Sequence, residues 1–128
     1  STDENSLQRL SERVTRLASK HSRPDGVSLH LETIGERPAG VVPVDSPIVK
    51  IATATLNVLG VDATLDASST DANVPIAAGI PAVCIGLTSG GNVHRVDEFI
   101  DTASVPLGLA QLGLLSLAIC ELLAANVI

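Results

Sequence analysis

The stretch that most constrains the fold runs from Asp66 to Glu98, where an apolar segment stands between two polar loops. The apolar segment, residues 82–87, is a continuous hydrophobic run, as a strand covered on both faces requires. The loop before it, 68–73, carries five small hydrogen-bonding side chains, and the loop after it, 89–94, places two glycines ahead of a histidine. Polar loops that follow parallel strands meet at one sheet edge, where open α/β folds bind ligands. We therefore predict an α/β fold with a mostly parallel sheet and a candidate site at that edge.

Hydrophobic spacing and turn residues predict that helices and strands alternate along the chain. Proline after Ser46 and glycine at position 60 are start and stop signals for a central helix. Alternation of apolar and polar residues predicts a half-buried strand after the first helix. The predicted helices span about residues 5–20, 47–59 and 104–124, with a short one capped by Asp71 or Asn73, and the predicted strands span 27–33, 63–67 and 82–87.

The last predicted helix has no charged residue between Thr102 and Cys120, which approaches the length of a membrane span. Pro106, Gly108 and Gln111 dilute this run, so we favour a buried helix over a span and expect no membrane association. Six residues at helical spacing could form its buried stripe. They are Leu107, Ala110, Leu114, Leu117, Ala118 and Leu122.

Composition narrows the functional class. The net charge of −6 argues against nucleic-acid binding, because phosphate contacts need clustered Lys and Arg. Five of the eight basic residues lie between residues 9 and 23, where they are interpreted as a solvated helix face. Cys84 and Cys120 stand in apolar surroundings without metal-like spacing, and no signal peptide opens the chain. We therefore expect buried free thiols in a cytoplasmic protein.

Several motifs occur in a fixed order. They are Ile34-Gly35-Glu36-Arg37-Pro38-Ala39-Gly40, Thr70-Asp71-Ala72-Asn73, Ala78-Gly79-Ile80-Pro81-Ala82, Gly90-Gly91, His94 and Asp97-Glu98. Together they resemble the carboxy-terminal part of the co-catalytic zinc peptidases related to peptidase T, glutamate carboxypeptidase, aminoacylase and succinyl-diaminopimelate desuccinylase. The first motif is similar to the return from that family's lid domain into its catalytic domain. The resemblance covers most of the chain.

The resemblance implies a domain organisation and an activity. Residues 1–40 would be the second half of a lid and dimerisation domain, and residues 41–128 the closing part of the catalytic domain. The intact enzyme would use two zinc ions to hydrolyse the amide bond of small peptides or N-acyl amino acids. The general base and the other metal ligands would lie in an absent amino-terminal half, so this fragment is expected to be inactive and to contain no catalytic residue. The family's lid often carries the subunit contact, and a severed fold would expose strand edges and apolar surface, so we expect a homodimer.

The resemblance also assigns roles to residues in the second polar loop. His94 would be the family's last metal ligand, with Gly90 and Gly91 lining the substrate site. Arg95 departs from the small hydroxyl residue that usually follows this histidine, and a cation beside a metal ligand is unfavourable unless it turns away, for example to Asp97. His30, on the polar side of a predicted strand, is interpreted as an exposed histidine.

Arg37 is the second candidate, because its guanidinium fork suits a substrate carboxylate and it stands at the family's lid hinge. The alternative is a structural ion pair with Glu36 or Asp45. Thr70, Asp71 and Asn73 could line the substrate site. Helix capping would explain Asp71 equally well.

Two rival functions remain open. A small α/β module could bind a ligand through the two polar loops without catalysis, and a dimerisation unit would need no ligand. The reading frame upstream of Ser1 distinguishes them from the peptidase fragment, which requires an H-x-D motif, a bridging Asp and a Glu-Glu pair there.

Overall fold

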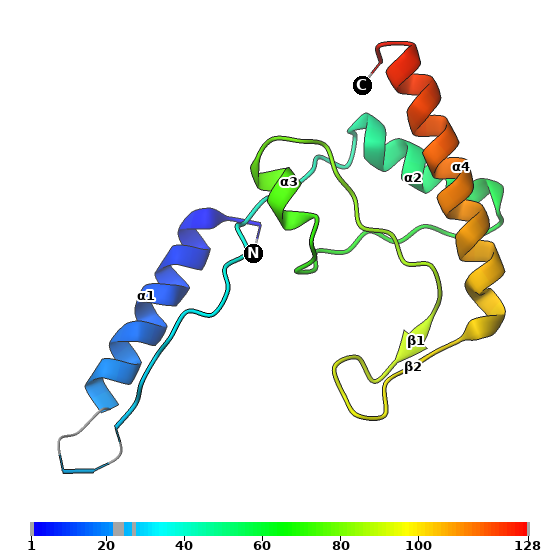
Figure 1. The fold of residues 1–128 in the computed structure, drawn as a ribbon. Coiled ribbons are helices and arrows are strands. Elements are labelled where there is room, and N and C mark those ends of the chain that lie inside the picture. The colour runs from blue at the N-terminus through cyan, green and yellow to red at the C-terminus, as the bar shows by residue number, and fades with distance from the viewer. Residues whose placement is uncertain (1, 22–24, 27, 128) are drawn as a thin grey trace. The chain divides into compact units, whose positions relative to one another are not determined.

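The computed structural model describes residues 2–21, 25–26 and 28–127. It divides into two compact units (Figure 1). Unit 1 comprises residues 1–41 and 67–80, and unit 2 comprises residues 42–66 and 81–128. Residues 67–80 thus belong with the amino-terminal segment, although the chain reaches them only after it has built part of unit 2.

Unit 1 contains helices α1 (Glu4–His21) and α3 (Asn73–Ala77). Asp3 begins α1, because its carboxylate accepts a 2.8 Å hydrogen bond from the Ser6 N–H and satisfies one of the free donors of the first turn. Hydrogen bonds from Ser6 hold the pKa of the Asp3 carboxyl below its usual range, and Arg9 adds a small effect in the same direction. The α1 helix was predicted correctly. Its cap is Asp3, two residues before the predicted start of the helix at about residue 5.

Unit 2 is built on α2 (Pro47–Val58) and α4 (Val105–Ala124), which pack against each other. Pro47 occupies the first turn of α2, and Gly60, at φ 75°, follows its end, as predicted. A short 3-10 helix, η1 (Thr102–Ser104), leads into α4. The local proline and glycine signals therefore delimit α2. The residues buried in this unit are Ile48, Val49 and Thr55 of α2 with Gly108, Gln111 and Leu115 of α4.

The predicted fold class is wrong. Helix makes up 48% of the structure, and the only strand pairing among the described residues joins β1 (Gly90–Gly91) to β2 (Phe99–Ile100) in antiparallel fashion. The segments 28–33, 63–67 and 82–87 have no regular structure, and Val27 lies outside the described residues. A strand is stable only when its backbone N–H and C=O groups pair with a neighbouring strand. An alternation of apolar and polar residues specifies which side chains face inward, but it does not provide a neighbouring strand.

The predicted buried stripe of α4 is also wrong. The helix buries Gly108, Gln111 and Leu115, a face adjacent to the predicted one. At Gly108 the backbone of Leu87 comes so close that a Cβ would overlap the Leu87 carbonyl oxygen, so this glycine determines which face turns inward. Because α4 is apolar all round, its sequence pattern selects no face by itself.

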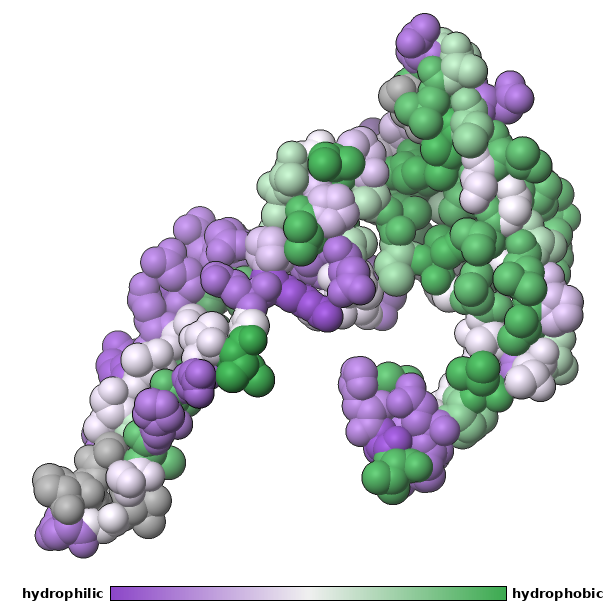
Figure 2. All heavy atoms as spheres, in the orientation of Figure 1, coloured by the Kyte–Doolittle hydropathy of each residue, from purple (hydrophilic) through white to green (hydrophobic). Residues whose placement is uncertain are grey.

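Six leucines of α4 remain exposed, and apolar surface covers much of this helix (Figure 2). The segment Thr102–Ala124 has the length and composition to cross a membrane, and only 17% of its most apolar window is buried. Both cysteines, Cys84 and Cys120, are exposed free thiols instead of the predicted buried ones. The terminal helix was therefore predicted correctly as an element and incorrectly as a buried one.

Candidate functional site

Four of the predicted site residues lie together in unit 1. We call Arg37, Ser69, Thr70, Asp71 and Asn73 the Arg37 cluster. The Arg37 guanidinium donates from Nη1 to the Ser69 carbonyl oxygen at 3.1 Å and to Ser69 Oγ at 3.3 Å, and from Nη2 to Asp71 Oδ1 at 3.3 Å. Its ionic partner is therefore Asp71, and not Glu36 or Asp45 as the structural alternative proposed.

Asn73 ties this loop to the segment around Pro38. Its Oδ1 accepts from the Thr70 N–H at 2.8 Å, and its Nδ2 donates to the Pro38 carbonyl oxygen at 2.9 Å. Thr70 Oγ1 in turn accepts from the Ala72 N–H at 3.3 Å. Asn73 is the first residue of α3 and does not cap it with its side chain, so its amide serves to hold the loop against Pro38.

The Arg37 cluster is open to solvent. The side chain of Arg37 is 51% exposed and that of Asp71 is fully exposed. An exposed pair of this kind contributes at most about 1 kcal/mol, so an incoming carboxylate can displace Asp71 at little cost. The fork of donors on Arg37 is thus oriented by the Ser69 backbone and remains accessible to an anion.

The second polar loop forms a hairpin in unit 2, here called the His94 hairpin (residues 89–101). Its ladder pairs Gly90 with Ile100 and Gly91 with Phe99, and the Asp101 N–H donates to the Ser89 carbonyl oxygen at 2.8 Å. A Cβ on Gly91 would lie 2.8 Å from the Phe99 ring, so close strand approach accounts for this glycine. The same holds for Gly90, whose Cβ would lie 2.5 Å from the Phe99 carbonyl oxygen.

Asp97 holds the tip of the His94 hairpin. Its Oδ1 accepts from Arg95 Nε at 2.9 Å, and its Oδ2 accepts from Arg95 Nη2 at 3.2 Å and from Asn92 Nδ2 at 2.9 Å. The Arg95 guanidinium is therefore paired with the Asp97 carboxylate through two hydrogen bonds. The sequence had suggested Asp97 as a partner for Arg95, and the structure forms this pair. The contact of Asn92 with Asp97 was not predicted.

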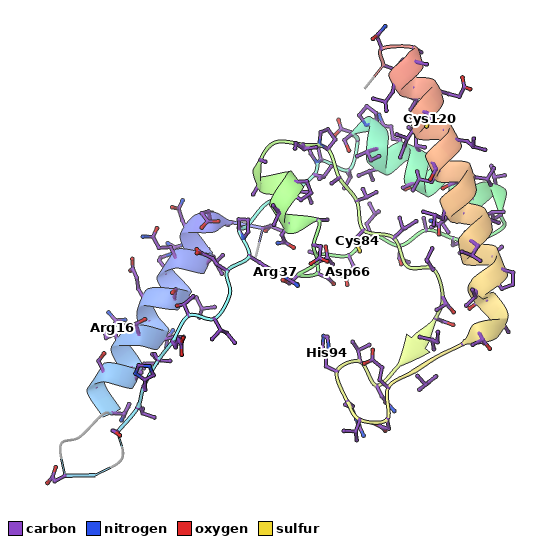
Figure 3. The ribbon with its side chains drawn as sticks, in the orientation of Figure 1. Arg16, Arg37, Asp66, Cys84, His94 and Cys120 are labelled. Carbon is purple, nitrogen blue, oxygen red and sulfur yellow. The ribbon has the colours of Figure 1, made fainter. Side chains whose placement is uncertain are left out.

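His94 itself lies at the exposed tip (Figure 3), with its backbone in the left-handed region at φ 64°. Asn92, two residues earlier, is also left-handed at φ 58°. This conformation is costly for a residue with a Cβ, and hydrogen bonds on both sides maintain it. The His94 N–H donates to Glu98 Oε2 at 3.3 Å, and the Arg95 N–H donates to the Asn92 carbonyl oxygen at 3.0 Å. The His94 imidazole is therefore exposed on a loop whose conformation is maintained by hydrogen bonds between its own residues.

The described residues do not form a zinc site by themselves. Within these ranges no group of three or more His, Cys, Asp or Glu side chains lies close enough to hold a metal ion. Around His94, the Asp97 carboxylate is engaged by Arg95 and Asn92, and Glu98 accepts from the His94 backbone. His30, exposed as predicted, lies in unit 1. One histidine by itself cannot hold two metal ions.

Comparison with known proteins adds no family. No family model, no curated protein and no solved structure matches this chain.

Proposed function

We propose that this chain is the carboxy-terminal portion of a zinc-dependent peptidase or acyl-amino-acid amidohydrolase. In this proposal residues 1–40 belong to a lid and residues 41–128 to the catalytic domain. The intact enzyme hydrolyses the amide bond of a small peptide or an N-acyl amino acid in the cytoplasm. The portion described here contributes one metal ligand and one carboxylate-binding side chain, and it has no hydrolytic activity alone.

The observation that carries the proposal is the exposed position of the His94 side chain on a loop whose conformation is fixed by hydrogen bonds. Its imidazole is exposed on a loop held by Asp97 and Glu98, and the Arg95 cation is paired with Asp97. That pairing removes the main objection to a metal ligand at this position, which is the repulsion between a metal ion and an unpaired neighbouring guanidinium. A single histidine on a loop held by hydrogen bonds is suited to complete a metal site whose other ligands come from another part of the enzyme.

The Arg37 cluster supports the same proposal from the side of the substrate. Peptides and acyl amino acids end in a carboxylate, and a guanidinium fork binds that group with two charge-assisted hydrogen bonds. Arg37 has this geometry, and its present partner Asp71 is fully exposed and easily displaced.

The first test is the gene upstream of Ser1. We expect it to encode an H-x-D motif, a bridging Asp and a Glu-Glu pair. A stop codon or an unrelated domain there would contradict the proposal. In the complete protein, His94→Ala should lower zinc occupancy and turnover together, while His30→Ala, the matched control at another exposed histidine, should leave both unchanged.

The second test concerns the substrate. Arg37→Ala should lower kcat/KM for substrates with a free carboxylate by about 10- to 100-fold, because it removes charge-assisted hydrogen bonds worth roughly 1.5–3 kcal/mol. Amidated substrates should be affected much less. An equal loss on both substrate classes would remove Arg37 from the binding site.

A non-catalytic binding or dimerisation module is the second candidate. The observation that favours it is the exposed apolar surface of α4, which is typical of an interaction surface and requires no metal. Turnover of small peptides by the complete protein, lost in His94→Ala, would exclude this candidate.

A further inference from the structure

Helix α1 carries a straight row of cations along one side. We call Arg9, Arg13, Arg16 and Lys20 the basic stripe of α1. At 100° and 1.5 Å per residue, the four side chains leave the helix within an arc of about 60° and extend over about 16 Å. All four residues are exposed. The basic stripe therefore forms a continuous line of positive charge on the surface of unit 1.

The chain itself neutralises little of this charge. In the basic stripe Arg9 has an ionic partner, Asp3, at 3.9 Å. The other three cations form no ion pair with a described residue. Glu12, which stands among them in the sequence, accepts a hydrogen bond from Gln8 instead. Because like charges three and four residues apart destabilise a helix, the basic stripe weakens α1, and an anionic partner would offset that loss.

Exposed apolar side chains lie beside the basic stripe. Leu10, Val14 and Leu17 are 58%, 47% and 46% exposed, and Leu17 lies about 40° from Arg13 around the helix. With Leu7 they recur at intervals of three, four and three residues, which is the spacing of the a and d positions in a coiled-coil heptad. This narrow stripe is typical of a helix that packs along another helix, and not of the broader apolar face that is inserted into a bilayer.

The charges beside this apolar stripe determine which helix can pack there. In the heptad register Arg13 and Lys20 occupy g positions, where charges pair with the e positions of the neighbouring helix and select the partner. A parallel second copy of α1 would place Arg13 opposite Ala18, and an antiparallel copy would bring the g cations together. Pairing of α1 with itself therefore gains no ion pair, whereas a helix with Asp or Glu at the facing positions gains two.

We propose that the basic stripe and the apolar residues beside it form a docking site for an acidic amphipathic helix of another protein. Leucines of that helix pack on Leu10, Val14 and Leu17, and its carboxylates pair with Arg13 and Lys20. This inference does not depend on the hydrolase function, because it uses the surface of α1 alone.

Binding of fluorescent peptides to the full chain, measured by anisotropy, tests the proposal. The probe is a peptide of four heptads with Leu at a and d and Glu at e and g. Its controls are the same peptide with Lys in place of every Glu, and a scrambled peptide of the acidic composition. The acidic heptad peptide should bind at least about 10-fold more tightly than either control, and added NaCl should weaken its binding.

A reversal of charge assigns the contact to α1. Arg13→Glu combined with Lys20→Glu should weaken binding of the acidic peptide by at least about 100-fold in Kd and make the lysine peptide the tighter ligand. Glutamate is a good helix former, so α1 should remain helical by circular dichroism. Lys50→Glu, which reverses an exposed cation on α2, is the matched control and should leave both Kd values unchanged.

A second variant tests the apolar part of the contact. Leu17→Gln retains helix propensity and should weaken binding of the acidic peptide by about 10-fold in Kd, because it removes an apolar side chain from the stripe. Leu123→Gln makes the same change at a leucine of α4 that is 55% exposed and should have no effect.

Three peptide results would overturn the proposal. They are no saturable binding of the acidic heptad peptide, equal binding of the acidic and scrambled peptides, and an unchanged peptide preference in the double variant. Binding of the chain to phosphatidylserine vesicles, without binding of the acidic peptide, would assign the basic stripe to a lipid surface and would also overturn it.

Discussion

The Arg37 cluster and the His94 hairpin are both small polar loops, but contacts of different sequence separation hold them. Arg37 and Asn73 bond to residues 32 to 35 positions away. In the hairpin, the bonds of Asp97 and Glu98 span two to five positions. A loop closed by distant contacts depends on the packing around it, whereas a locally closed loop needs little beyond its own residues. The His94 hairpin should therefore tolerate changes elsewhere in the chain that disrupt the Arg37 cluster.

The largest loss of stability is expected at Gly108, where the helix backbone lies against the backbone of Leu87, a residue distant in the sequence. Gly108→Ala should lower the free energy of unfolding by roughly 2–3 kcal/mol, because its Cβ would overlap the Leu87 backbone, which cannot move aside as a flexible side chain could. Urea denaturation measures this loss. Gly113→Ala on the same helix is the matched control and should raise stability by about 0.5–1 kcal/mol. Equal effects at the two glycines would show that the close approach of Leu87 is not required.

A smaller loss is expected in the Arg37 cluster. Asn73→Ala leaves the Thr70 N–H and the Pro38 carbonyl oxygen without their partners and should cost about 2 kcal/mol of unfolding free energy. Asn57→Ala, at an exposed position on α2, should be neutral or slightly stabilising. The amide protons of the His94 hairpin should exchange at the wild-type rate in Asn73→Ala. Faster exchange there would mean that the two loops are coupled.

A substitution within the His94 hairpin should affect the stability of the hairpin alone. Asp97→Ala removes the bidentate pair with Arg95 and the bond from Asn92, and should destabilise the hairpin by about 1 kcal/mol. The Asp101 N–H, which bonds to Ser89, should then exchange about fivefold faster. Asp71→Ala, which removes an exposed partner in the other loop, should leave this rate unchanged.

The smallest effect concerns the cap of α1. The pKa of Asp3 is lowered in the folded chain, so its stabilisation of the helix is present above the ordinary carboxyl pKa and is lost as the pH falls through the lowered value. The Ser6 amide proton, measured by NMR, should therefore titrate at a pH below the usual range of an aspartate. This titration should vanish in Asp3→Asn and persist in Glu32→Gln. A Ser6 titration at the ordinary carboxyl pKa would contradict the hydrogen-bonded cap.

The local sequence was sufficient to predict the helices as elements and to identify most of the polar residues of both loops. Pro47 and Gly60 delimit α2 because proline and glycine impose their backbone preferences wherever they stand. Thr70, Asp71 and Asn73 lie together in the structure because they are neighbours in the sequence. The part played by Ser69 could not be predicted, because Arg37 bonds mainly to its backbone carbonyl, which every residue has.

The chain by itself determined where α2 begins and ends, because the proline in its first turn and the glycine just past its end act within a few residues. Tertiary structure alone decided whether an apolar run becomes a paired strand, since the partner must come from another part of the polypeptide. The run 82–87 illustrates this, because no described segment pairs with it as a strand. Tertiary structure also selected the buried face of α4, because a helix that is apolar all round packs wherever a neighbour comes closest, here at Gly108.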